Sequence, residues 1–162
     1  MKKAIVYYSM SGNTEYVANY ISKKVDADLI RIEPKKEYPN KGLKKFLWGG
    51  RSAVMGETPE LENYEFDSDK YDCIIFGTPV WASSFTPPIR TFINENKEKL
   101  KGKKIAAFVC YMGAGADKTI EKLKQILDIQ NISAELKLID PKDKKSEEKD
   151  RKMEEFCEDV CR

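Results

Sequence analysis

Near its N-terminus the chain reads Tyr8-Ser9-Met10-Ser11-Gly12-Asn13-Thr14, and the rest of the sequence is organised around this loop. The residues before it, 3–8, are apolar and β-branched enough to form a buried strand. The residues after it, 15–25, repeat apolar side chains at the spacing of an amphipathic helix. A strand that runs through a short loop into a helix predicts an α/β fold.

The loop itself carries hydroxyls, an amide and one glycine, without a formal charge. Free N–H groups at a helix N-terminus, together with the helix dipole, favour a bound anion. Side-chain donors could come from Ser9, Ser11, Asn13 and Thr14. The loop is therefore either a phosphate cradle or an ordinary βα turn in which Asn or Thr caps the helix.

Two common phosphate motifs are excluded in this loop. A P-loop requires Gly-Lys-Ser/Thr, and no lysine follows Gly12. The dinucleotide fingerprint requires G-x-G-x-x-G, and Gly12 is the only glycine present. A phosphate bound here would be held by neutral dipoles, without an obligatory lysine or metal.

Composition limits the chemistry that the chain can perform. Its 162 residues, 41% of them hydrophobic, fit one domain over 1–162. Charged residues nearly cancel to a net charge of +2, which argues against a nucleic-acid partner. Histidine is absent, which removes the usual general base, His-containing zinc sites and His-activated nucleophiles. We expect no catalytic side chain and no metal site.

Cysteine usage and hydropathy indicate a cytoplasmic protein. Cys73 and Cys110 lie in apolar runs, as buried thiols do. Cys157 and Cys161 are four residues apart, and a redox or metal role for this pair remains an alternative. No apolar run reaches the length of a membrane span, and the N-terminal apolar stretch is too short for a signal peptide.

Strands and helices alternate along the rest of the chain. Further strands are predicted at 28–32, 72–76, 103–110 and 133–139. Helices are predicted to begin near Thr86-Pro87-Pro88 and at Asp117, and a last one covers 151–160 after a loose, charged segment. This pattern predicts a three-layer, doubly wound, parallel five-stranded sheet.

The segment 35–60 is the least regular part and is rich in lysine. Residues 43–55 could form one helix that is weakened at Gly49-Gly50. The lysines are either a solvated face or a contact for an acidic partner or a second nucleotide.

Three loops are predicted at the carboxyl edge of the sheet, where such folds bind ligands. The loop of residues 8–14 can take a phosphate. The loops after the strands at 72–76 and 103–110 supply flat apolar side chains, and their glycines let backbone groups reach a ring edge. A ligand with one terminal phosphate and a large, planar, polar-edged ring is flavin mononucleotide (FMN).

The same stretches resemble a known family. Ser9-Met10-Ser11-Gly12-Asn13-Thr14 resembles the flavodoxin phosphate loop, and residues 77–92, beginning Gly77-Thr78-Pro79-Val80-Trp81, resemble the second flavin loop and following helix of short-chain flavodoxin-like proteins. The resemblance implies noncovalent FMN and the strand order 2-1-3-4-5. It also implies that Trp81 stacks on the ring. The chain departs from dedicated flavodoxin carriers in not being acidic.

The predicted cofactor contacts come from the three loops. They are Ser9, Met10, Ser11, Gly12, Asn13, Thr14, Thr78, Pro79, Val80, Trp81, Ala82, Ser83, Ser84, Cys110, Tyr111, Met112, Gly113, Gly115 and Ala116.

Two functions are compatible with an FMN site of this kind. The first is an electron carrier that shuttles electrons between redox partner proteins. The second is an NAD(P)H-dependent reductase of quinones, azo dyes or free flavin. A signalling receiver domain of the same topology is disfavoured, because no acidic cluster follows the first strand. We expect no nucleic-acid partner and no membrane association.

Overall fold

The computed structural model describes residues 1–39 and 42–162, and the side chains of 42–47 lie outside that description. The lysines at 41, 44 and 45, interpreted above as either a solvated face or a partner contact, are therefore outside the described side chains.

The core of the fold is a parallel five-stranded sheet. Its strands are β1 (Lys3–Tyr7), β2 (Ala27–Arg31), β3 (Cys73–Pro79), β4 (Lys104–Tyr111) and β5 (Glu135–Ile139). They lie in the order β2-β1-β3-β4-β5, with every neighbouring pair parallel. The predicted α/β class and strand order are confirmed. From β1 the chain first adds β2 on one side and then β3 on the other. The carboxyl ends of β1 and β3 therefore flank the topological switch point, where the strand order reverses.

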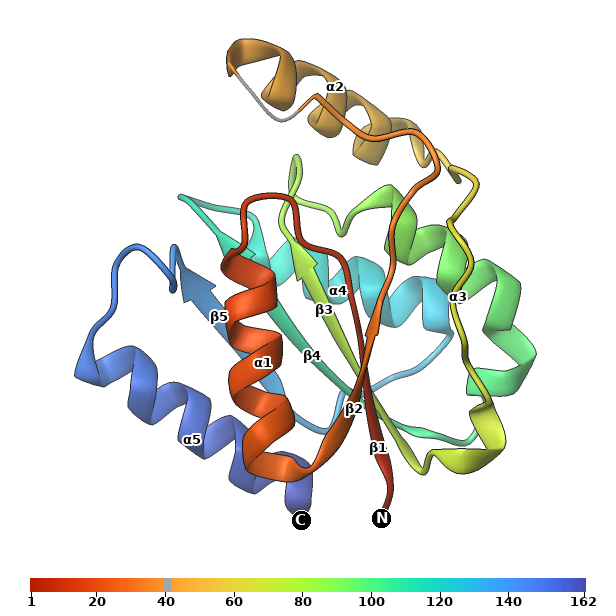
Figure 1. The fold of residues 1–162 in the computed structure, drawn as a ribbon, viewed down its shortest axis with the longest axis vertical. Helices are drawn as coiled ribbons and strands as arrows, with labels where there is room; N and C mark the ends of the chain where they lie inside the picture. Colours follow the sequence, from red (N-terminus) through yellow and green to blue (C-terminus); the bar gives the residue numbers. More distant parts are fainter. Residues whose placement is uncertain (40–41) are drawn as a thin grey trace.

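Helices cover both faces of the sheet, as Figure 1 shows. Those on the faces are α1 (Asn13–Val25), α3 (Pro87–Leu100), α4 (Ala116–Leu127) and α5 (Glu147–Cys161), while α2 (Gly42–Met55) lies beyond the edge of the sheet and a short 3-10 turn occupies Ser68–Lys70. One buried cluster joins α1 and α5 to the sheet, and a second joins α3 and α4 to its other face. Apart from Lys3, Thr78 and Lys104 near their ends, the central strands are largely apolar because both of their faces are covered.

Two helices differ from their expected form. Helix α2 continues through Gly49 and Gly50 without a break. Helix α5 begins at Glu147, four residues before the expected start, because the Ser146 hydroxyl accepts the Lys149 N–H and caps it.

Both chain ends lie at one end of the molecule, and α2 lies at the other (Figure 1). The loops that follow the strand tips are on the α2 side, so the termini and these loops are at opposite ends. Within the described residues, no helix combines the length and apolar character needed to cross a lipid bilayer.

Candidate functional site

A cavity of about 240 Å³ opens at the carboxyl edge of the sheet, between the loops that follow β1, β3 and β4. Its walls are mainly apolar and include a few polar groups. They consist of Met10, Ser11, Asn13, Thr14, Gly50, Pro79, Val80, Trp81, Ala82, Cys110, Tyr111, Met112, Gly113, Ala114 and Asp140. The three loops predicted to meet do so around one concave site.

Most of the predicted contact residues lie on this wall, and seven do not. The seven outside it are Ser9, Gly12, Thr78, Ser83, Ser84, Gly115 and Ala116. Two of them support the walls from behind. The buried Thr78 hydroxyl accepts the Thr86 N–H at 3.1 Å, and the Ser9 hydroxyl accepts the Glu15 N–H at 3.2 Å.

The first loop has the features of an anion cradle. Gly12 is the residue that precedes α1, with φ at +92°, a conformation that glycine adopts without strain. Gly12 has no side chain with which to cap the helix, so the alternative of an ordinary turn capped by Asn or Thr is not what the structure has here. Because the Ser9 hydroxyl already accepts the Glu15 N–H, the N–H groups of Asn13 and Thr14 are the ones left to face a ligand.

Thr14 supplies an independent sign that this loop takes a ligand. Its side chain is 1% exposed, and its hydroxyl lacks a hydrogen-bond partner apart from the weakly polar Cys110 thiol beside it. A buried hydroxyl left without a full hydrogen bond is costly. A phosphate above the helix N-terminus would satisfy it, so the loop fits the phosphate end of FMN.

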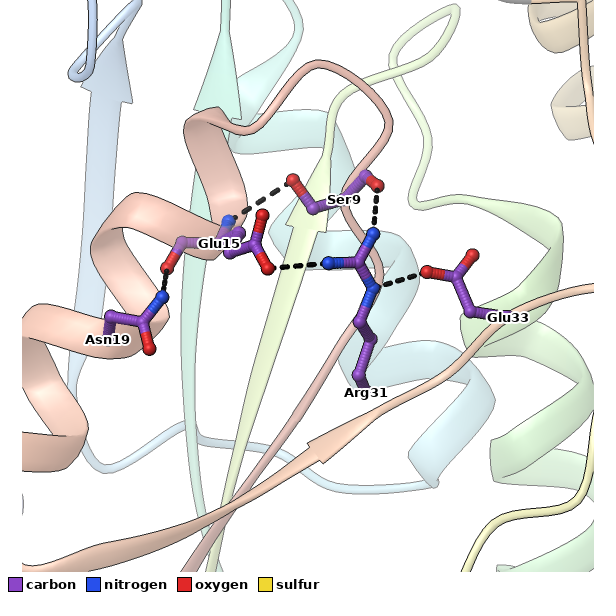
Figure 2. Close-up of polar contacts among 5 residues, drawn as sticks. All are labelled: Ser9, Glu15, Asn19, Arg31 and Glu33. Carbon is purple, nitrogen blue, oxygen red and sulfur yellow. Dashed lines mark hydrogen bonds and ion pairs between the residues drawn. The ribbon is translucent and has the colours of Figure 1, made fainter.

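Arg31, at the end of β2, holds the first loop in place (Figure 2). Its Nη1 donates to Glu15 Oε1 at 2.5 Å and its Nη2 to the Ser9 carbonyl at 3.4 Å, while its Nε donates to Glu33. The planar guanidinium can make all three contacts at once. Arg31 thus ties the start of the loop to the first turn of α1.

The second loop is a tight turn at the end of β3. Trp81 and Ser84 exchange two backbone hydrogen bonds of 2.8 and 3.0 Å. Ala82 and Ser83 between them both have positive φ, at 49° and 56°. Residues other than glycine rarely adopt a positive φ, so the packing around the turn must hold it in this conformation.

Trp81 lines the cavity and belongs to an aromatic cluster. Its ring meets Tyr8 and Tyr38 edge-on, with centroids 5.8 and 5.1 Å away. On another side lies α2, where a Cβ added to Gly49 would come within 3.1–3.2 Å of three indole carbons. The indole is thus fixed in place, and its predicted stacking on the ring remains a prediction.

The third loop is packed closely against the second. A Cβ added at Gly115, where φ is +95°, would come within 2.6 Å of Ser83 Oγ and 2.9 Å of its Cα. The Val80 N–H donates to the Cys110 carbonyl at 3.0 Å. Burial raises the pKa of the Cys110 thiol to about 12, so this wall of the cavity is uncharged.

Four residues at this site are absent from the predicted contacts, namely Gly50, Ala114, Asp140 and Lys142. Gly50 and Asp140 line the cavity, and the Asp140 carboxylate pairs with Lys144 at 2.9 Å. Lys142 donates its backbone N–H to Asn13 Oδ1 at 2.9 Å. The loop after the fifth strand begins at the same carboxyl edge of the sheet as the other three loops. This topological rule could have pointed to the turn containing Asp140 and Lys142.

Comparisons with solved structures support the same fold. A flavoprotein from Lactobacillus acidophilus, in complex with FMN, is 24% identical, with a TM-score of 0.72 over 86% of this chain and 93% of that chain. The two-electron reduced flavodoxin of Megasphaera elsdenii is 21% identical, with a TM-score of 0.61 over 98% and 97%. Rubredoxin oxygen:oxidoreductase from Desulfovibrio gigas is 13% identical, with a TM-score of 0.63 over 98% of this chain and 35% of that longer one.

The sequence also matches a family as a whole. The family model for flavodoxin matches residues 2–155, which is nearly the whole chain. The match covers all five strands and the three loops around the cavity. The chain therefore belongs to the flavodoxin family, an FMN-binding family, as its sequence predicted.

Proposed function

We propose that this protein is an electron carrier that binds FMN noncovalently and passes electrons between redox partner proteins. The observation that carries the proposal is the size of the cavity. At about 240 Å³ it is smaller than the roughly 300–1,000 Å³ typical of small-molecule sites. It can hold one planar ring, without space inside for a second ring stacked on the first.

The rim of the cavity supports the same function. Its exposed residues, Ser11, Ala82, Met112, Gly113 and Ala114, are uncharged, and Met112 is 62% exposed. An uncharged, accessible rim lets a partner protein approach the cofactor closely. Bound FMN would supply the electron-transfer chemistry, and the chain would orient it and exclude water from its inner face.

One observation favours an NAD(P)H-dependent reductase as the alternative function. A second cavity of about 360 Å³ lies on the other side of the first loop and shares Met10 with the first cavity. Arg31 and Lys35 line it, and so do Glu33, Glu37 and Glu62. The negative charges of these carboxylates would repel the phosphates of a nucleotide, so the electron carrier remains the stronger proposal.

Anaerobic absorbance spectroscopy tests the two functions. The FMN-loaded protein is mixed first with NADPH, then with NADH, and finally with dithionite. A carrier keeps its flavin bands through both nucleotides and loses them with dithionite. Prompt bleaching by either nucleotide, at a rate above that of free FMN under the same conditions, would overturn the proposal in favour of the reductase.

We place this activity in the cytoplasm. All four cysteines are free, and Cys73, Cys110 and Cys157 are buried as thiols. Free thiols fit a reducing compartment.

A further inference from the structure

The turn between β5 and α5 touches the first loop at Gly12. The Nζ of Lys142 lies 3.1 Å from where a Cβ on Gly12 would stand, and its Cδ and Cε lie 3.6 and 3.8 Å away. The Lys142 backbone is fixed by the 2.9 Å hydrogen bond to Asn13 Oδ1. The lysine side chain therefore runs alongside the glycine of the anion cradle.

The charge on Lys142 is not neutralised by the rest of the described chain. No ion pair among the described residues includes Lys142, whereas Lys144 in the same turn is paired with Asp140 at 2.9 Å. The first loop, residues 9–14, contributes no charged side chain of its own. An unpaired ammonium thus stands beside Gly12, in a loop of neutral donors that also holds the Thr14 hydroxyl, whose one partner is the weakly polar Cys110 thiol.

We propose that Lys142 binds the terminal phosphate of FMN and makes the site selective for FMN over riboflavin. The inference rests on FMN being the cofactor, but not on what the protein does with the electrons. A phosphate ester carries about −1.5 to −2 charges at pH 7, and riboflavin has the same ring and side chain without it. A cation beside the cradle therefore stabilises FMN alone.

The experiment compares apo-protein variants by flavin fluorescence titration. In Lys142→Met we expect the Kd for FMN to rise roughly five-fold at low salt, because a unit charge pair at ~4 Å in water contributes about 1 kcal/mol. The Kd for riboflavin should stay unchanged. Raising the salt concentration should weaken FMN binding to the wild type more than to the variant, since salt screens an exposed pair.

The chain offers a matched control in Lys145→Met. Lys145 lies in the same turn, but its ammonium is 5.3 Å from the centroid of the Tyr16 ring. This variant changes the net charge equally and should bind FMN with less than a two-fold change in Kd. Lys142→Arg, which keeps a cation at the position, should retain most of the selectivity.

A second readout uses inorganic phosphate and no flavin. Phosphate should raise the melting temperature of the wild-type apo-protein more than that of Lys142→Met. Equal loss of FMN and riboflavin affinity in Lys142→Met, or equal effects in the two methionine variants, would overturn the role of Lys142. Failure of the wild type to bind FMN would overturn the cofactor assignment as well.

Discussion

At the scale of single residues, Arg31 shows how a side chain outside the cavity can shape it. Its guanidinium joins the first turn of α1, the first loop and Glu33. The side chain is 40% exposed, so these ion pairs contribute little to overall stability. Their effect is local, because the Ser9 carbonyl lies at the start of the anion cradle.

We expect Arg31→Lys to weaken FMN binding roughly three-fold to ten-fold and to leave the melting temperature nearly unchanged. Lysine keeps the charge but cannot make the three contacts of the guanidinium fork. Fluorescence titration and thermal melting measure the two effects. Arg151→Lys is the control, since Arg151 pairs with Glu155 on the solvent side of α5. An unchanged Kd for FMN in Arg31→Lys would refute this positioning role.

Among single residues, the hydroxyl-bearing and apolar residues of the site are easier to predict from the sequence than the charged residues that contact its loops. The residues of the first loop could be assigned because a strand, a loop and a helix are adjacent in the chain. Topology could have placed the turn that contains Lys142 at this sheet edge, but not the particular contact of Lys142 with Asn13, which joins residues 129 positions apart. The alternative of an Asn or Thr cap is not observed, because Gly12 takes the capping position and the Asn13 side chain accepts from the Lys142 N–H instead.

At the scale of elements, α2 illustrates why a glycine pair need not break a helix. The sequence predicts weakness at Gly49-Gly50, because glycine costs roughly 1 kcal/mol against alanine inside a helix. The structure gives Gly49 a packing role, since its missing side chain lets α2 approach the indole of Trp81. A pattern of single residues cannot reveal such a contact between distant segments.

We predict that Gly49→Ala displaces α2 from Trp81, although alanine favours the helix. Its Cβ would lie 3.1–3.2 Å from three indole carbons, which is too close for unstrained packing. In a Trp48→Phe background, the emission of Trp81 should shift to longer wavelength. Gly50→Ala is the matched control, because its Cβ would meet only Ala82 Cβ at an ordinary 3.7 Å. Identical spectra for the two variants would contradict the prediction.

Element boundaries were less predictable than element order. The alternation of strands and helices determined the topology, since parallel strands need crossovers. Helix α5 starts earlier than its apolar stripe suggests. Two features of the sequence indicate the earlier start. Ser146 is a favourable capping residue, and the first turn carries acidic residues that suit the helix dipole, namely Glu147, Glu148 and Asp150.

At the scale of the whole molecule, buried thiols link stability to pH. Burial raises the pKa of Cys110 to about 12 and that of Cys157 to about 11, from an ordinary value of 9.0. Between pH 9 and those values, the unfolded chain loses protons that the folded chain keeps. Stability therefore falls as pH rises through this window and is fully present below pH 9.

We expect the free energy of unfolding to fall with pH above 9, by up to ~1.4 kcal/mol per pH unit for each such thiol. Urea unfolding at pH 8, 9, 10 and 11 measures the slope. Cys110→Ala should make the slope shallower, because it removes one buried thiol with a raised pKa. Identical slopes for the wild type and Cys110→Ala would refute the contribution of Cys110.

The termini lie at the opposite end of the molecule from the loops that line the cavity (Figure 1), which has a practical consequence. A tether attached to either terminus would hold the molecule at the end that carries the termini. The opening of the FMN cavity, at the opposite end, would then face away from the attachment point. A protein anchored in this way to an electrode would present every copy in the same orientation for current exchange. The similar fold that forms 35% of the longer Desulfovibrio gigas chain illustrates that this architecture can also be joined to further polypeptide.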